Sequence, residues 1–128
     1  MKVLAVIIVV LSLTAAEYTL DEMATAFRGC GAEYGGPNDI RKLVVAPDAD
    51  IVTLSPMCLC IDVKLGVTNE NGDINKHALR EIVMLLTGNK STADKVDERC
   101  TERNGETALI ASFNLWRCAR LIIDNENN

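Results

Sequence analysis

The sequence contains a single histidine, His77, among its 128 residues. A zinc site with two histidine ligands therefore cannot form within one chain. No serine or cysteine nucleophile stands at the spacing of a Ser-His-Asp or Cys-His arrangement around it. His77 lies among Asn75, Lys76 and Arg80, which predicts a solvated surface histidine rather than a catalytic base. We expect no enzyme.

Motifs for phosphates and metal ions are also lacking. No glycine-rich phosphate loop occurs. The turn at residues 69–72 resembles part of a calcium loop, but placing Gly72 at the sixth loop position puts Val67 first and Ala78 twelfth. Carboxylates are required at those two positions, so the match fails. We expect neither a metal ion nor another cofactor.

Apolar runs long enough to span a membrane are missing, since the longest, Val3–Leu13, falls short of the roughly 20 residues needed. This run follows Lys2 and precedes Thr14-Ala15-Ala16, which is typical of a secretory signal peptide. We expect residues 1–16 to be that peptide and residues 17–128 to be one soluble, secreted, extracellular domain without stable membrane association. The sequon Asn89-Lys90-Ser91 could carry a glycan in such a protein.

Positive charge is scarce as well. The chain has 13 Lys and Arg against 18 Asp and Glu, and loss of Lys2 with the leader leaves 12 against 18, a net charge of −6. An acidic surface without a basic stripe argues against nucleic acid and anionic membranes as partners.

Apolar residues recur at helical spacing throughout the secreted part, and no alternating stretch of strand length competes with them. We predict an all-α domain, a compact array of about six short helices. The expected helices lie near residues 20–35, 40–44, 55–65, 74–87, 91–100 and 106–124. Their expected N-caps, where the sequence offers one, are Thr19, Asn38 or Asp39, Ser55, Asp73 and Ser91.

Five cysteines are present: Cys30, Cys58, Cys60, Cys100 and Cys118. An odd number in an oxidising compartment predicts two disulfides and one spare thiol, or a link between chains. In the helix at 55–65, Cys60 shares the apolar face of Met57, Ile61 and Leu65, whereas Cys58 lies about 200° away around the helix. This facing argument favours Cys60 over Cys58 for a buried bridge, but the sequence does not choose among the fifteen arrangements.

Two segments, residues 60–66 (Cys-Ile-Asp-Val-Lys-Leu-Gly) and 71–75 (Asn-Gly-Asp-Ile-Asn), resemble the region after the third cysteine of insect odorant-binding proteins of the pheromone/general-odorant-binding family. Residues 112–118 also keep that family's pattern before its last cysteine. Pro56 and Leu109 stand where the family's second and fifth cysteines are expected. Because those two pair with each other, their joint absence is typical of the minus-C subgroup.

The resemblance implies two disulfides, Cys30–Cys60 and Cys100–Cys118, and leaves Cys58 as a free thiol without a counterpart. A disulfide typically contributes about 2–4 kcal/mol to the stability of a fold. A buried leucine, such as Leu109 in place of one cysteine, contributes about 1.5–3 kcal/mol, so we expect the core to recover part of that loss. We therefore predict a looser joint between the third and sixth helices than in six-cysteine relatives.

The function that the resemblance implies is reversible carriage of small hydrophobic ligands, such as odorants or pheromones, in an internal apolar cavity. A chemosensory receptor is a further implied partner, and we expect a monomer or weak dimer. The candidate ligand-binding residues are the bulky inward positions of five helices: Phe27, Met57, Ile82, Leu86, Val96, Phe113 and Trp116.

Two other functions fit a small secreted helical protein. A lipid or hormone carrier of body fluid would share the cavity but prefer longer ligands. A secreted helical interaction protein would have a solid core and no cavity. Sequence periodicity does not separate a filled core from a hollow one.

Overall fold

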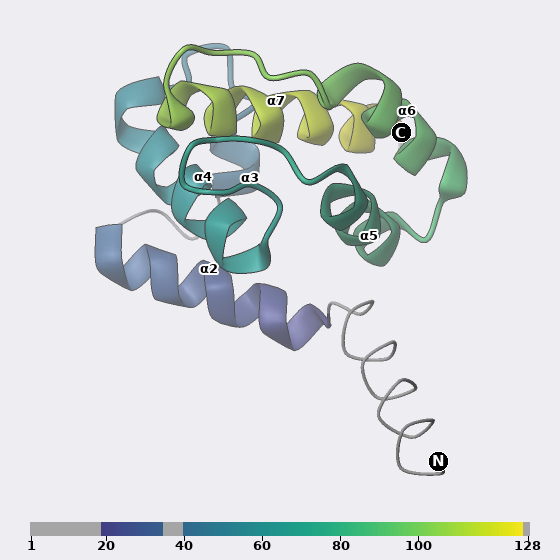
Figure 1. Cartoon of the computed structure of the whole chain (residues 1–128), viewed down its shortest axis with the longest axis horizontal. Coiled ribbons are helices and arrows are strands. Elements are labelled where there is room, and N and C mark those ends of the chain that lie inside the picture. The colour runs from purple at the N-terminus through teal and green to yellow at the C-terminus, as the bar shows by residue number, and fades with distance from the viewer. Residues whose placement is uncertain (1–18, 35–39, 127–128) are drawn as a thin grey trace, which may run out of the picture.

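Six helices form the part of the chain that the computed structural model describes, residues 19–34 and 40–126 (Figure 1). They are α2 (Leu20–Tyr34), α3 (Ile40–Leu43), α4 (Ile51–Leu65), α5 (Lys76–Thr87), α6 (Lys90–Cys100) and α7 (Ala108–Glu126). The only β pairing among these residues is an isolated bridge between Thr68 and Ile74. The predicted all-α fold is confirmed. The predicted signal peptide and the Asn38 or Asp39 cap lie outside the described residues.

No helix within the described ranges has the length and apolar character needed to cross a membrane.

Helix starts were predicted correctly for α2 and wrongly for three others. The Thr19 hydroxyl oxygen accepts a hydrogen bond from the Glu22 N–H at 3.1 Å, as an N-cap should. The other three helices are capped by Asp50 (α4), Asn75 (α5) and Asn89 (α6) rather than by Ser55, Asp73 and Ser91. In each case an Asp or Asn side chain at another position accepts from backbone N–H groups of the first turn.

The early start of α4 places Pro56 inside the helix instead of at its first position. Asp50 accepts from the N–H groups of Val52 and Thr53 at 3.1 and 3.4 Å, so the helix begins a turn before Ser55. Pro56 has no N–H to donate to the Val52 carbonyl. Val52 lies in the exposed first turn, with 83% of the residue accessible to solvent, and α4 continues past the proline.

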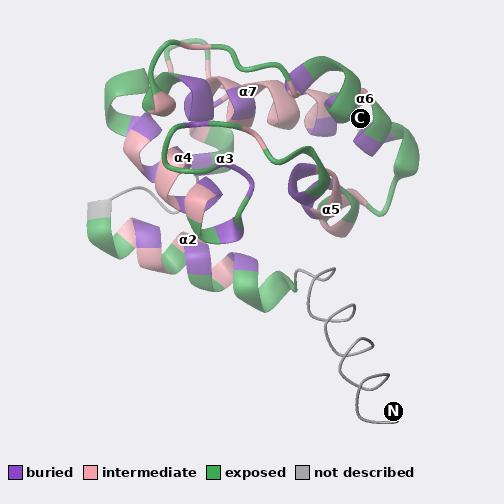
Figure 2. Cartoon of the chain, in the orientation of Figure 1, coloured by how far each residue is buried: buried purple, intermediate pink, exposed green. Residues whose placement is uncertain are grey.

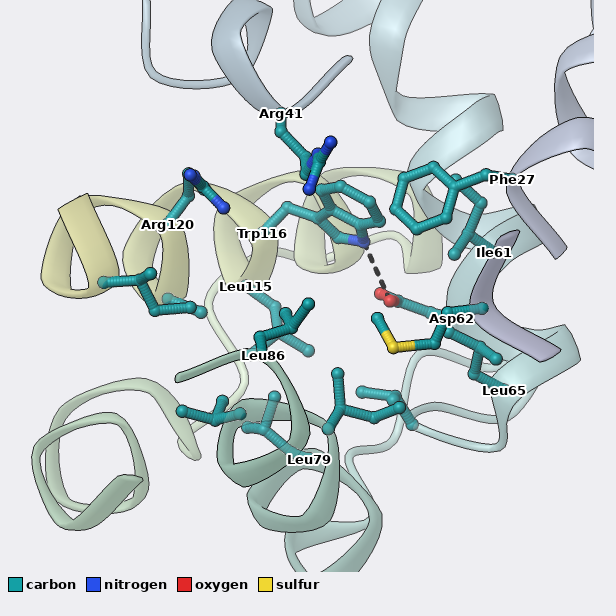
Figure 3. Close-up of a pocket in the computed structure, with 16 residues that line it drawn as sticks. Phe27, Arg41, Ile61, Asp62, Leu65, Leu79, Leu86, Leu115, Trp116 and Arg120 are labelled. Atoms are coloured by element: carbon teal, nitrogen blue, oxygen red, sulfur yellow. Dashed lines mark hydrogen bonds between the residues drawn. The ribbon is translucent and has the colours of Figure 1, made fainter. Parts of the chain in front are cut away.

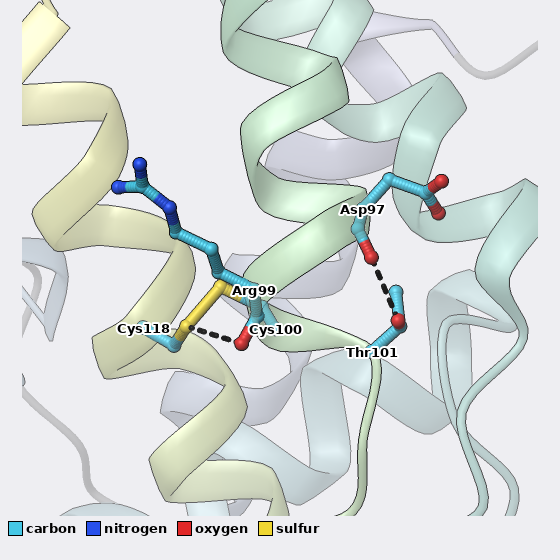
Figure 4. Close-up of a disulfide and its surroundings, with 5 residues drawn as sticks. All are labelled: Asp97, Arg99, Cys100, Thr101 and Cys118. Carbon is cyan, nitrogen blue, oxygen red and sulfur yellow. Dashed lines mark hydrogen bonds between the residues drawn. A yellow bond between two sulfur atoms is a disulfide. The ribbon is translucent and has the colours of Figure 1, made fainter.

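α4 packs against both α2 and α7 (Figure 1). The disulfide Cys30–Cys60 joins α2 to α4, and Cys100–Cys118 joins α6 to α7, each with Cα atoms 5.8 Å apart. Both implied disulfides are confirmed. Figure 4 shows the second one, where the Thr101 hydroxyl donates to the Asp97 carbonyl at 2.7 Å as α6 ends. The joint between α4 and α7 carries no covalent link.

Burial on α4 corrects the facing argument for its two cysteines. Cys58 is fully buried and is the free cysteine, while Cys60 is only half-buried, at the side of α4 that meets α2. The buried face of α4 comprises Leu54, Ser55, Met57, Cys58, Ile61, Asp62 and Leu65. Two adjacent rows of the helix therefore face inward, and the second row includes Cys58 and Asp62 rather than Cys60. Figure 2 shows buried segments (purple) alternating with intermediate and exposed ones along α4.

The first turn of α7 is more exposed than its apolar sequence predicts. Leu109 and Ile110 are 40% and 39% exposed. Farther along α7, Ala111, Ser112, Phe113, Leu115 and Ile123 are buried.

Candidate ligand-binding site

An apolar cavity of about 90 Å³ lies among α2, α4, α5 and α7. We call it the inner cavity. Its apolar walls include Met23 and Phe27 of α2, Ile61 and Leu65 of α4, Leu79 and Ile82 of α5, and Leu115 and Trp116 of α7. Among the described residues, three charged side chains line it: Arg41, Asp62 and Arg120 (Figure 3).

A second hollow of about 330 Å³, the outer groove, adjoins the inner cavity. Both are lined by Met23, Phe27, Arg41 and Leu86. These four side chains therefore form the boundary between the groove and the cavity.

The seven candidate ligand-binding residues fall into three groups. Phe27, Ile82, Leu86 and Trp116 line the inner cavity. Met57 lines the outer groove instead. Val96 and Phe113 are each 1% exposed and belong to the packed core, where they support the helices without lining either hollow.

Two aromatic rings meet at the cavity wall. The rings of Phe27 and Trp116 have centroids 5.5 Å apart and planes at 70°, an edge-to-face contact. The guanidinium of Arg41 lies 5.9 Å from the centroid of the Phe27 ring. The contact ties α2 to α7 and places a cation at the cavity edge.

Asp62 is the buried polar group of this site, with 4% of its surface exposed. Its carboxylate accepts hydrogen bonds from the Ser112 hydroxyl at 2.5 Å and from the Trp116 indole N–H at 2.8 Å. Figure 3 shows the carboxylate directed at the indole from the opposite wall. Burial raises the pKa of Asp62 to about 7, and the bonds from Ser112 and Trp116 oppose that rise.

The free thiol of Cys58 lies one helical turn before Asp62 and is fully buried. Burial, and secondarily the negative charge of Asp62, raises the pKa of this thiol. A protonated, inaccessible thiol is a poor nucleophile. Cys58 is thus a core side chain in the folded chain, although the facing argument placed it on the opposite side of the helix from Cys60.

Asp62 was missing from the candidate residues, although the sequence held one signal for it. Leu54, Cys58 and Asp62 recur at i, i+4 and i+8, so an acid sits on a row of otherwise apolar residues. Charged residues are almost never fully buried without partners. The partners here, Ser112 and Trp116, are 50 and 54 residues away in the chain, which sequence spacing does not reveal.

His77 is 74% exposed and pairs with Glu81 at 3.3 Å, which confirms the predicted surface position. Within the described ranges, no group of three or more His, Cys, Asp or Glu side chains is placed to hold a metal ion. Comparison with protein-family models, with curated proteins and with solved structures finds no match.

Proposed function

We propose that the chain is a secreted, non-catalytic carrier that reversibly binds small hydrophobic molecules, of the minus-C odorant-binding type that its cysteine pattern resembles. The observation that carries this proposal is the inner cavity, whose walls are apolar apart from Asp62 and two arginines. Affinity would come from removing apolar ligand surface from water.

Three features support the proposal. The two disulfides are typical of an oxidising, extracellular setting. They fix α2 to α4 and α6 to α7, so three of the four helices that form the apolar walls, α2, α4 and α7, each carry a covalent link. The fourth, α5, lies outside both disulfides and contributes rotatable apolar side chains such as Leu86 and Ile82.

The size of the cavity favours small ligands over long chains. About 90 Å³ is less than the roughly 150 Å³ of a cavity known to take benzene. A ring-sized molecule would therefore enter only if the boundary side chains between cavity and groove moved to enlarge the cavity. This favours an odorant-sized ligand over the longer ligands of a lipid or hormone carrier.

Trp116 provides a direct binding assay, because it is the only tryptophan of the chain and lines the cavity. Toluene entering the cavity should displace solvent from the indole and shift its emission to shorter wavelength. The shift should saturate with toluene concentration. No change in emission at the solubility limit of toluene would contradict the proposal and favour a solid-core interaction protein.

A filled-cavity variant tests whether the response arises in the cavity. Ala119 lines the inner cavity, so Ala119→Leu should occupy part of its volume and weaken toluene binding at least tenfold, the effect of about 1.4 kcal/mol. Ala32 is exposed on α2, and Ala32→Leu makes the same change in volume away from the cavity. Equal toluene binding by the two variants would place the binding site elsewhere.

A further inference from the structure

The wall of the inner cavity that α5 forms is held less firmly than the other three. One disulfide joins α2 to α4, and the other joins α7 to α6. α4 also packs closely against α7, whereas α5 packs closely against α6 and only loosely against the helices across the cavity. Because the cavity must enlarge to admit a ring-sized molecule, α5 is the wall that can move at the least cost.

The turn that leads into α5 is a rigid extension of that helix. The Asn75 N–H donates to the Val67 carbonyl at 2.7 Å, and the Asn75 side chain caps α5. The Asn69 side chain closes the turn by accepting two backbone N–H groups. Val67, at the start of the turn, is buried and lines the inner cavity. Residues 67–87 therefore form one continuous piece of the cavity wall, which we call the α5 flap.

Arg103, in the loop between α6 and α7, ties the α5 flap to the rest of the chain. Its Nη1 donates to the Asn71 carbonyl at 2.6 Å and lies 3.4 Å from Oδ1 of Asp73, both in the flap. Its Nε and Nη2 donate to the carbonyls of Gly105 and Glu106 at 3.0 and 3.2 Å, both in its own loop. A planar guanidinium presents its donors in a fixed fork, so this one side chain bridges the two loops.

The turn also meets the start of α7 beside this guanidinium. A Cβ atom at Gly72 would lie 2.9 Å from the Cα of Ala108, the first residue of α7, and 3.3 Å from Nη1 of Arg103. The flap contains no cysteine, so its attachment to α7 is entirely noncovalent.

We propose that Arg103 is the clasp of the inner cavity: its hydrogen bonds hold the α5 flap closed, and their release lets the flap move away from α4 and α7 so that a ligand enters or leaves. This inference rests on the proposed carrier function. Arg103 lines neither the inner cavity nor the outer groove, so it is a positioning residue that acts through the flap. Movements of such loops set the rates of binding and release in many proteins.

A clasp has a kinetic signature that a merely stabilising residue lacks. Arg103 makes the same bonds in the closed chain with and without ligand, so their loss favours opening equally in both states. The association and dissociation rate constants for toluene should therefore rise by the same factor, while the dissociation constant stays unchanged. NMR exchange broadening of the Trp116 indole signal during a toluene titration measures both rate constants.

Arg103→Gln removes the charge and the fork together, and should raise both rate constants about tenfold. Arg103→Lys keeps a positive charge beside Asp73 but not the fork, so it should accelerate exchange less. Arg80→Gln is the matched control, because Arg80 pairs with Asp94 at 2.6 Å and its side chain is 32% exposed, against 34% for Arg103. That pair joins α5 to α6, which stay packed together, so exchange should match that of the unaltered chain.

Unchanged rate constants in both Arg103 variants would overturn the clasp while leaving the carrier function intact. Equal acceleration by Arg80→Gln would also overturn it, because any loss of an ion pair around α5 would then have the same effect. Faster dissociation without faster association would show that Arg103 only supports the closed wall. Failure of the unaltered chain to bind toluene would contradict the carrier function on which the clasp depends.

Discussion

Replacing Asp62 by asparagine should remove a pH-dependent cost from the folded state. The pKa of this carboxyl rises from 3.8 to about 7 on folding, because burial disfavours the charged form. The native chain therefore holds the proton more tightly than the unfolded chain. This tighter proton binding adds to the free energy of unfolding. The added stability is fully present below about pH 4 and is lost as the pH rises through about 7. Over that window the group changes the free energy of unfolding by about 4 kcal/mol.

Urea unfolding of both chains at intervals from about pH 4 to about pH 8 measures this quantity. Other carboxylates titrate equally in the two chains, so their effects cancel in the difference. The free energy of unfolding of Asp62→Asn minus that of the unaltered chain should increase by about 4 kcal/mol as the pH rises from the lower to the upper end of this range. Parallel stability curves would refute the reasoning, because Asp62 would then titrate in the folded chain as it does in water.

Further predictions concern the groups around Asp62. Cys58 is fully buried, so a thiol reagent should label the native chain very slowly and the denatured chain once; rapid native labelling would contradict its burial. Ser112→Ala removes a donor to Asp62 and should raise the pKa of that carboxyl and lower stability by about 1–3 kcal/mol at pH 8. The control Ser91→Ala, at an exposed position, should have little effect, and equal losses in the two variants would remove the special role of Ser112. Hydrogen exchange should be faster in α4 and α7 than in the corresponding helices of a six-cysteine odorant-binding protein, and equal rates would argue against a looser joint.

The helical fold could be predicted because apolar periodicity is local. The inward orientation of Met57, Ile61 and Leu65 follows directly from their helical spacing. Helix starts were harder, because Ser55 and Asp50 are both good caps and only the fold shows which one accepts the backbone N–H groups. The choice of Asp50 moved Pro56 into the helix interior.

The site could be predicted in part, for a different physical reason. Phe27, Ile82 and Trp116 are large apolar residues on inward faces, and such residues border any hollow between those helices. Hydropathy did not distinguish them from Phe113, which occupies the solid core. Asp62 escaped prediction because its burial depends on two donors from a helix far away in the sequence.

The most direct test of a ligand cavity is an NMR measurement of contacts between bound toluene and the protein. The methyl groups of Leu79, Ile82 and Leu115 line the inner cavity from two helices. We predict nuclear Overhauser effects from toluene protons to these methyl groups, and none to the exposed methyl groups of Leu121. Contacts with Leu121 alone, or no contacts at the solubility limit of toluene, would contradict a binding cavity between the helices.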